Sequence, residues 1–303
     1  ASELTAFLDQ LTEDPEFGLS AEVALIRSEL LRGGDISTAL AQLNELLKER
    51  PDSQPLKFLK AHILAATGKP DEAESLYRAI LKIQPGATSV WGTLHALHLA
   101  QGAPEKAQAV LKDALNALPD EPNLLLLQAA DYERAREIDK AIEVYEKLYA
   151  YNSQSRIVAN NLASLLTTHR TDDESLQRAV TLARRLRGAK VPAFQDTYGW
   201  VTYRMGNYEE ALAELDAAIA IDSNDVWAWA NRGTVLLSLN RLDEAEQAFD
   251  RADAIAPGNF VSLRGRGYVV QNRDRAYDRA TYLFNRSLEL DPDNAFAHFH
   301  RGF

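Results

Sequence analysis

The chain has 303 residues, of which 46% are hydrophobic and 25% charged, and this composition is typical of a folded globular protein. Its 33 basic and 44 acidic residues leave a net charge of −11, which argues against general nucleic-acid binding and against binding to an anionic membrane. The absence of cysteine excludes disulfides, thiol catalysis and zinc–thiolate or iron–sulfur sites. No apolar run reaches the roughly 18–20 residues of a membrane span, so we expect no direct membrane insertion.

The N-terminal segment, residues 1–19, is expected to form a capping helix from Glu3 to about Leu11. Its apolar residues recur every three or four positions, which places them on one face of a helix. This face would cover the first of the repeated units that follow.

Internal repeats dominate the rest of the chain. Pro51, Pro85 and Pro119 lie 34 residues apart. The segment 71–85 has the same order of acidic, small, aromatic and aliphatic residues as the segment 243–257. A fixed period of this length indicates a repeat architecture in which each unit is one supersecondary element.

Alanine recurs once in every unit, at Ala39, Ala73, Ala107, Ala141, Ala179, Ala211, Ala245 and Ala280. This pattern resembles the tetratricopeptide repeat (TPR) family, whose 34-residue unit is a helix–turn–helix. On the family's register the units begin near Ser20, Gln54, Thr88, Pro122, Arg156, Pro192, Val226 and Phe260. The resemblance implies an all-α fold, a right-handed superhelical solenoid of TPR repeats.

The resemblance also sets the expected domain organisation: eight repeats over residues 20–294, then residues 295–303 as the first helix of a truncated ninth. Stacked repeats need a polar terminal unit, so we expect the parent protein to continue beyond Phe303. Extra residues near 168–174 predict a longer loop between the two helices of that repeat, and one further extra residue falls near 275–277.

A narrower resemblance covers the stretches 160–166, 179–183 and 196–212, which are similar to bacterial TPR proteins of exopolysaccharide and envelope systems. A generic TPR variant accounts for the same residues equally well. Localisation in a bacterial periplasm or envelope and localisation in the cytoplasm both stay open.

In TPR proteins the first helix of each repeat lines a concave groove. On this register the first half of the groove is largely apolar, with Phe58, Leu59, Leu126 and Leu127, and His62 nearby. The second half is polar and aromatic, and we expect it to bind a partner because amides and Arg satisfy a peptide backbone while Trp and Tyr supply contact area. The candidate residues are Asn160, Asn161, Ser164, Thr167, Asp196, Trp200, Tyr203, Arg204, Trp227, Asn231, Arg264, Tyr268 and Gln271. The alternative is that the aromatic residues pack between helices and the amides are only solvated.

One TPR subclass binds acidic C-terminal tails through a clamp of Lys, Asn and Arg. Asn160 or Asp196 stands here where Lys is required, and only Arg264 is suitably basic. The clamp is therefore incomplete.

The six histidines do not form a metal motif. His95 and His98 fall at packing positions, while His298 and His300 would point to different sides of a helix. No zinc spacing, phosphate-binding glycine loop or nucleophile elbow is present, so we expect no metal, no cofactor and no catalytic residue.

The sequence thus predicts a non-catalytic scaffold that binds a peptide or protein partner in its concave groove, with a place in bacterial envelope or exopolysaccharide assembly. One alternative is the regulatory TPR portion of a larger enzyme such as a glycosyltransferase. Another is a structural scaffold that self-associates through its end repeats. No nucleic-acid partner is expected.

Overall fold

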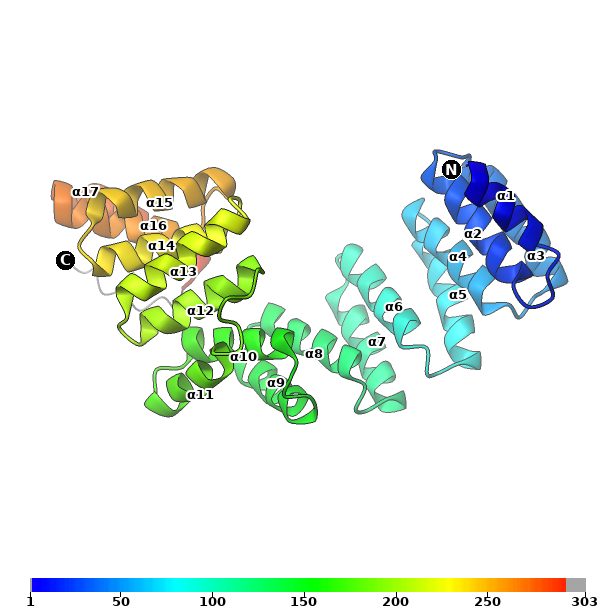
Figure 1. Cartoon of the computed structure of the whole chain (residues 1–303), viewed down its shortest axis with the longest axis horizontal. Coiled ribbons are helices and arrows are strands. Elements are labelled where there is room, and N and C mark those ends of the chain that lie inside the picture. Colours follow the sequence, from blue (N-terminus) through cyan, green and yellow to red (C-terminus); the bar gives the residue numbers. More distant parts are fainter. Residues whose placement is uncertain (1, 293–303) are drawn as a thin grey trace. The chain divides into compact units, whose positions relative to one another are not determined.

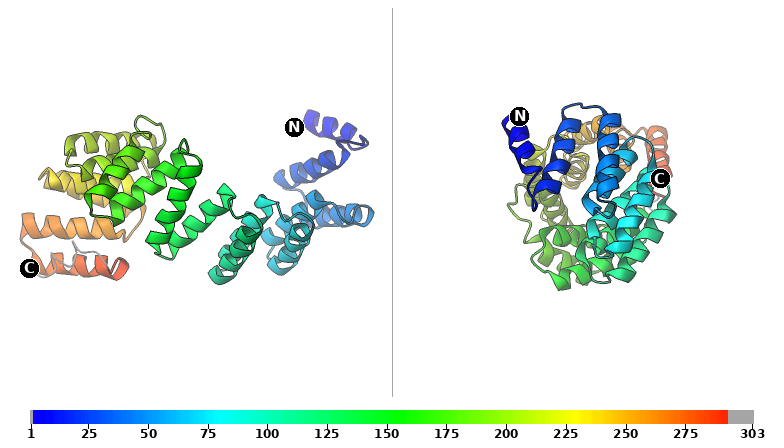
Figure 2. Two further views of the ribbon diagram at one scale, coloured as in Figure 1. Left: turned by 90° about the horizontal axis from the view of Figure 1, so that it is seen from below. Right: turned by 90° about the vertical axis from the view of Figure 1, so that its right-hand side faces the viewer.

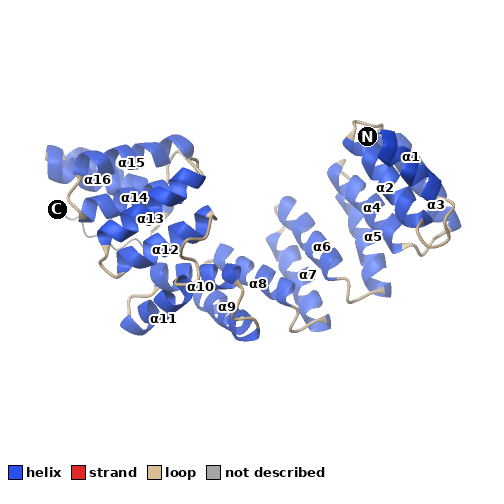
Figure 3. Ribbon diagram, in the orientation of Figure 1, coloured by secondary structure: helices blue, strands red, loops and turns tan. Residues whose placement is uncertain are grey.

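The computed structural model describes residues 2–292, and every regular element in this range is a helix (Figure 3). The all-α prediction is confirmed. No helix in the described range is both long and apolar enough to cross a membrane. The predicted first helix of a ninth repeat, residues 295–303, lies outside the described residues.

The helices form two compact units, divided between Ala135 and Arg136. The first unit holds α1 (Ser2–Leu11), α2 (Gly18–Leu31), α3 (Ile36–Glu49), α4 (Gln54–Ala66), α5 (Pro70–Ile83), α6 (Thr88–Ala100), α7 (Pro104–Ala117) and α8 (Pro122–Arg134) (Figure 1). The Arg32 guanidinium on α2 donates a 2.8 Å hydrogen bond to the Thr5 hydroxyl, which ties α1 to α2.

The second unit holds α9 (Ile138–Tyr151), α10 (Arg156–His169), α11 (Asp173–Ala183), α12 (Pro192–Arg204), α13 (Tyr208–Ile221), α14 (Val226–Ser238), α15 (Leu242–Ile255), α16 (Phe260–Val269), the π-helix η1 (Val270–Asp274) and α17 (Tyr277–Leu290). Within this unit α14, α15, α16 and α17 pack successively against one another (Figure 1 and the left view of Figure 2). We call α10, α12, α14 and α16 its A helices, and α11, α13, α15 and α17 its B helices.

Local chemistry places the start of each A helix. In seven repeats the first helix begins at the repeat start given above; these helices are α4, α6, α8, α10, α12, α14 and α16. Helix α2 begins at Gly18, two residues before Ser20. Asp225 and Asn259 accept hydrogen bonds from backbone N–H groups in the first turns of α14 and α16, and Pro192 stands at the first turn of α12. These are favoured N-terminal signals because they satisfy or remove unpaired N–H donors.

The longer loop predicted near residues 168–174 is wrong. Only residues 170–172 separate α10 from α11, as in the neighbouring repeats. The inserted residues extend the helices instead, because Asp172 caps α11 by accepting from the Ser175 N–H and starts that helix three residues earlier relative to Ala179.

The extra residue predicted near 275–277 is accommodated in a widened helical turn. Helix α16 continues directly into η1, whose wider turn holds one more residue than an α-turn. Arg275 then adopts a left-handed conformation with φ of 56°, which ends the helix at the place where other repeats use glycine, such as Gly206.

The core is built from B-helix residues packed against small A-helix residues. Phe249 on α15 is fully buried, and its ring lies over Gly233 on α14 and Gly265 on α16. A Cβ atom at Gly233 would lie 2.5 Å from the ring, and one at Gly265 would lie 2.1 Å from it. Phe284 on α17 has the same relation to Gly267, at 2.7 Å. One buried aromatic ring therefore joins two successive repeats.

We expect Gly265→Ala to lower the free energy of unfolding by about 1–3 kcal/mol, because the Phe249 ring is enclosed and cannot move away without overpacking its neighbours. Gly92→Ala is the matched control, since a Cβ there meets only Leu127 at 3.7 Å and the change should stabilise α6 by up to ~1 kcal/mol. Urea unfolding followed by circular dichroism measures both. Equal effects of the two substitutions would contradict this account of the packing.

Candidate functional site

A continuous row of polar and aromatic side chains runs across α12 and α14. The rings of Trp200 and Tyr203 stack with centroids 4.9 Å apart, and Tyr203 packs against Tyr208 at 5.5 Å. The Tyr203 hydroxyl lies 3.2 Å from the Ser238 hydroxyl on α14. Two turns earlier on the same two helices, Asn231 Nδ2 donates a 2.8 Å hydrogen bond to Asp196 Oδ1.

We call Asp196, Trp200 and Tyr203 of α12, with Asn231 and Ser238 of α14, the α12–α14 strip. Residues three, four and seven apart lie on one face of a helix, so the strip is one surface and not a scatter of side chains. The hydrogen bonds between the two helices hold its side chains in place.

Arg264 lies on α16, and Tyr203 of α12 and Asp291 both interact electrostatically with its guanidinium. Burial lowers the pKa of Arg264, while Tyr203 and Asp291 oppose that shift.

The α10 amides are partly engaged. Asn161 Nδ2 donates to the Tyr145 hydroxyl at 2.9 Å, and Asn160 Nδ2 donates to Asn161 Oδ1 at 3.1 Å. The Asn160 Oδ1 atom is buried and has no hydrogen-bond donor in the described part of the chain. Asn160 therefore keeps one unused acceptor.

Two other predicted residues, Thr167 and Arg204, have structural roles at the end of α10. Thr167 is buried, and its hydroxyl donates to the Ala163 carbonyl within its own helix at 2.5 Å and to the Ser164 carbonyl at 3.2 Å. Arg204 donates to the carbonyls of Thr167 and Arg170, the latter at 3.1 Å. These bonds satisfy carbonyls at a helix C-terminus, which accounts for Arg204 and Thr167 without a ligand.

The remaining predicted residues lie on α14, α16 and η1. Trp227 is 50% exposed and meets the Phe260 ring edge-on at 5.9 Å. Tyr268 and Gln271 are half-buried, and the Tyr268 carbonyl accepts from Asn272. Sequence reasoning missed Tyr208 and Ser238 as contacts of Tyr203, although Ser238 occupies a position of the A helix that commonly faces the groove.

The Asp196 carboxyl has a strongly shifted acidity. The pKa of this carboxyl is raised to about 7, chiefly because burial disfavours the charged form. The hydrogen bond from Asn231 opposes that shift, and the nearby Asp225 carboxylate adds to it. Near neutral pH this carboxyl is therefore close to half ionised, which is unusual for an aspartate.

The first unit carries a different, more apolar surface. A cavity of about 600 Å³ is lined by residues of α2, α4, α5 and α6, including Val23, Arg27, Phe58 and Val90. Phe58 packs on His62 and Tyr77, with ring centroids 6.1 Å and 5.7 Å apart. Of the other residues expected there, Leu59 is buried in the core, whereas Leu126 and Leu127 are half-buried.

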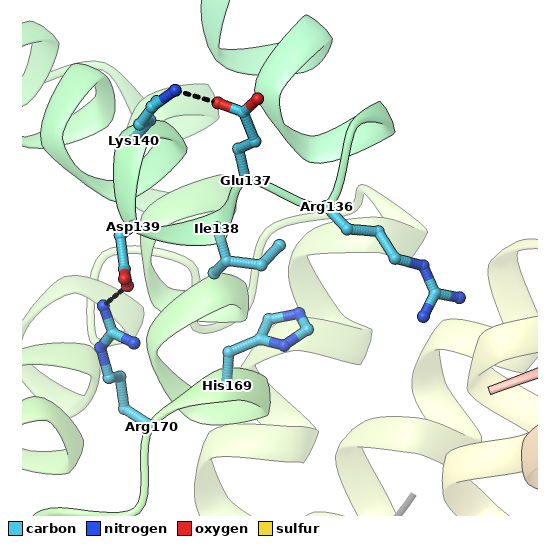
Figure 4. Close-up of a pocket in the computed structure, with 7 residues that line it drawn as sticks. All are labelled: Arg136, Glu137, Ile138, Asp139, Lys140, His169 and Arg170. Carbon is cyan, nitrogen blue, oxygen red and sulfur yellow. Dashed lines mark hydrogen bonds and ion pairs between the residues drawn. The ribbon is translucent and has the colours of Figure 1, made fainter. Parts of the chain in front are cut away.

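A second, polar hollow of about 500 Å³ lies in the second unit between the start of α9 and the end of α10. Ile138 and His169 lie side by side on its wall, between two ion pairs, Lys140 with Glu137 and Arg170 with Asp139 (Figure 4). Arg136, which also lines the hollow, pairs with Asp291, so each of the four ion-paired lining residues and Arg136 already has a partner.

The histidines proposed for packing lie in the first unit. His95 Nε2 lies 2.8 Å from Asp131 Oδ2, and both side chains are buried between α6 and α8. His98 contacts Gln101 at 3.2 Å. Among the described residues no group of three or more His, Asp or Glu side chains could hold a metal ion, and His298 and His300 lie outside that range.

Comparison with known proteins identifies the family of this chain. Two family models, both described as tetratricopeptide repeat, match residues 30–97 and 64–130 in one case and residues 199–260 in the other. Together these stretches make up more than half of the chain.

Curated relatives match only in part. "Anaphase-promoting complex subunit 3" of Schizosaccharomyces pombe is 27% identical over 152 residues, which is 49% of this chain and 22% of that protein. "TPR repeat-containing thioredoxin TTL4" of Arabidopsis thaliana is 22% identical over 94% of this chain and 42% of its own length. The chain thus spans less than half the length of these relatives.

Solved structures share the fold. A tetratricopeptide repeat protein from Parabacteroides merdae superposes with a TM-score of 0.63 at 14% identity, covering 82% of this chain and 97% of that one. The Cut9–Hcn1 structure of the APC/C gives a TM-score of 0.61 at 14% identity, covering 97% and 57%.

The raised pKa of Asp196 predicts how stability depends on pH. Between the ordinary value of 3.8 and about 7 the native carboxyl holds a proton that the unfolded chain has released, so this group makes the native state less stable as the pH rises through that window. Asp196→Asn removes the titration and keeps an oxygen for Asn231. We expect the variant to match the parent near pH 4 and to be more stable at pH 8, with a difference that grows by no more than about 1.4 kcal/mol per pH unit.

Urea unfolding at pH 4, 6 and 8 tests this expectation. Asp278→Asn is the control, because Asp278 lies exposed in the first turn of α17. Parallel pH profiles for the parent and Asp196→Asn would show that this carboxyl titrates normally.

Proposed function

Because the chain belongs to the tetratricopeptide repeat family, whose members serve as protein-interaction scaffolds, we propose that it binds a peptide segment of a protein partner along the A-helix face of its second unit. The observation that carries this proposal is the α12–α14 strip, where stacked aromatic rings lie beside a hydrogen-bonded carboxyl–amide pair on the A-helix face.

The strip has the chemistry that peptide recognition uses. Trp200 and Tyr203 are half-buried, so each still presents part of a large, stiff ring at low entropy cost. Asn231 and Ser238 are fixed by partners on α12 and offer polar atoms beside those rings. An extended peptide needs both kinds of contact, since its backbone groups form hydrogen bonds and its side chains pack on surfaces such as aromatic rings.

The order of the α12–α14 strip before a partner arrives also supports peptide binding. The bonds from Asn231 to Asp196 and from Tyr203 to Ser238 join neighbouring A helices, so the surface exists before a partner arrives. A rigid surface loses little conformational entropy on binding, and more of the contact energy becomes affinity. The TPR fold is typically non-catalytic, and we propose that this chain acts by binding alone.

We propose the same residues of the groove as predicted from the sequence, with Thr167 and Arg204 in supporting positions. In this proposal residues 1–19 cap the first repeat and residues 20–294 form eight repeats. The resemblance of residues 160–212 to bacterial envelope proteins supports a partner in envelope or exopolysaccharide assembly.

A second function has one specific observation in its favour. "Protein O-mannosyl-transferase Tmtc3" of Drosophila melanogaster is 26% identical over 162 residues, which is 46% of this chain and 17% of that protein. The repeats would then bind the substrate protein of a larger transferase. The proposed groove is the same in both cases, and only the identity of the partner separates them.

We expect Trp200→Ala to weaken peptide binding at least tenfold, because it removes the larger ring of the stack from the centre of the strip. Peptides selected from a random display library on the parent chain are measured against each variant by fluorescence anisotropy. Tyr282→Ala is the control, since Tyr282 is 62% exposed on the B helix α17.

The two variants separate the possible outcomes. Loss of binding with Trp200→Ala and retention with Tyr282→Ala supports the groove. Equal affinity for both variants places binding elsewhere, and a library that yields only copies of the chain itself, seen as concentration-dependent mass, favours self-assembly. Pull-down from a bacterial envelope fraction with the same pair then identifies the natural partner.

A further inference from the structure

We propose that the Asp196 end of the α12–α14 strip is a subsite for a basic side chain, Lys or Arg, of the bound peptide. The inference rests on the proposed function and adds the chemical class of residue that the groove selects. It follows from the unused acceptor capacity of the Asp196 carboxyl and from the aromatic surface beside it.

Asp196 is only half satisfied. Its Oδ1 atom accepts from Asn231 at 2.8 Å, and Asn231 is the single hydrogen-bond donor that the described part of the chain supplies to this carboxyl group. A carboxylate has about four lone-pair sites, so its second oxygen is available to a donor from outside. A partly buried carboxylate without a cation is costly, and a ligand that brings the cation removes that cost.

Two buried acceptors nearby in the fold also lack donors. Asn160 Oδ1 and Gln195 Oε1 are enclosed and unbonded among the described residues. Asn160 is the fifth residue of α10 and Asp196 the fifth of α12, so the two stand at the same level of adjacent, packed helices. Gln195 immediately precedes Asp196, but it is buried and lies on a different face of α12. Asp196 is the acceptor that a ligand on the strip can reach, and its unused capacity favours a ligand rich in donors.

Basic side chains fit this requirement. A Lys ammonium carries three N–H donors and no acceptor, and an Arg guanidinium carries five. A carboxylate would place a second negative charge beside Asp196, and a neutral hydroxyl would bring no charge to pair with it. The donor count therefore favours a cation over any other common peptide side chain.

The aromatic stack gives the cation a second contact. Trp200 follows Asp196 by four residues, which places the two side chains one above the other on α12. Trp is the best aromatic partner for a cation positioned over its face, and a carboxylate beside the ring favours the same ligand. The aliphatic part of Lys or Arg also packs well on such a ring.

The surrounding charges favour a cation at this end. Asp225, at the start of α14, is the charged group that acts on Asp196, and it adds negative potential. Across the packed helices, Asn160 and Asn161 on α10 are neutral, while Glu210 and Glu214 on α13 act on Tyr198 with Arg187. Arg264 interacts with Tyr203 and Asp291, and Tyr203 lies seven residues, or roughly 10 Å of helix, from Asp196. The net charge of −11 attracts basic segments at long range.

The test uses four pools of acetylated and amidated nonapeptides that lack histidine. Their central residue is fixed as Lys, Arg, norleucine or citrulline, and the last two are neutral analogues of the first two. Binding is measured by fluorescence anisotropy at pH 8 for the parent chain, for Asp196→Asn, which preserves the acceptor for Asn231, and for the control Asp278→Asn. Circular dichroism checks that all three chains are equally helical.

We expect the parent and Asp278→Asn to bind the Lys and Arg pools at least tenfold more tightly than the neutral pools, and Asp196→Asn to lose this preference. Because the Asp196 carboxyl must ionise to pair with the cation, the affinity of the parent for basic pools should also fall about tenfold from pH 8 to pH 6, while that of neutral pools stays constant.

Other results overturn the inference in recognisable ways. Equal binding of basic and neutral pools by the parent refutes the subsite but leaves peptide binding in the groove intact. A preference for basic pools that survives in Asp196→Asn shows that another carboxylate selects the cation. Binding of no pool by the parent chain would refute the proposed function as well.

Discussion

The close approach of one aromatic ring to two glycines is the contact on which the second unit depends. Phe249 is completely enclosed between α14 and α16, and it fits only because Gly233 and Gly265 lack a Cβ atom. Packed interiors have no spare volume, so the ring fixes both the spacing of these helices and the angle between successive repeats. Phe284 repeats the arrangement against Gly267.

The A-helix face carries contacts between neighbouring A helices. Asn231 of α14 reaches Asp196 of α12, and Tyr203 of α12 reaches Ser238 of α14. Tyr203 also interacts electrostatically with Arg264 on α16. These interactions depend on the spacing of the helices, because each one joins side chains from different repeats.

The second unit also contains buried polar atoms without hydrogen-bond partners among the described residues. Asn160 and Gln195 have buried oxygen atoms without donors, and Asp196 has a pKa near neutrality because of its burial. Folded chains normally avoid such groups, and they concentrate where a protein binds or reacts. The structural positions of Thr167 and Arg204, which only complete the end of α10, show the contrast with residues whose polar atoms remain unused.

The sequence by itself determined the helical class, the repeat register and the buried alanines, because periodicity of apolar residues and capping signals act within a few turns of the chain. Ala73 and Ala245, for example, are fully buried as their register requires. Only the tertiary structure decided which groove residues stay available. Whether Arg204 meets a ligand or the carbonyl of Arg170, and whether Asp196 finds a donor, depends on side chains about 35 residues away that no local pattern encodes.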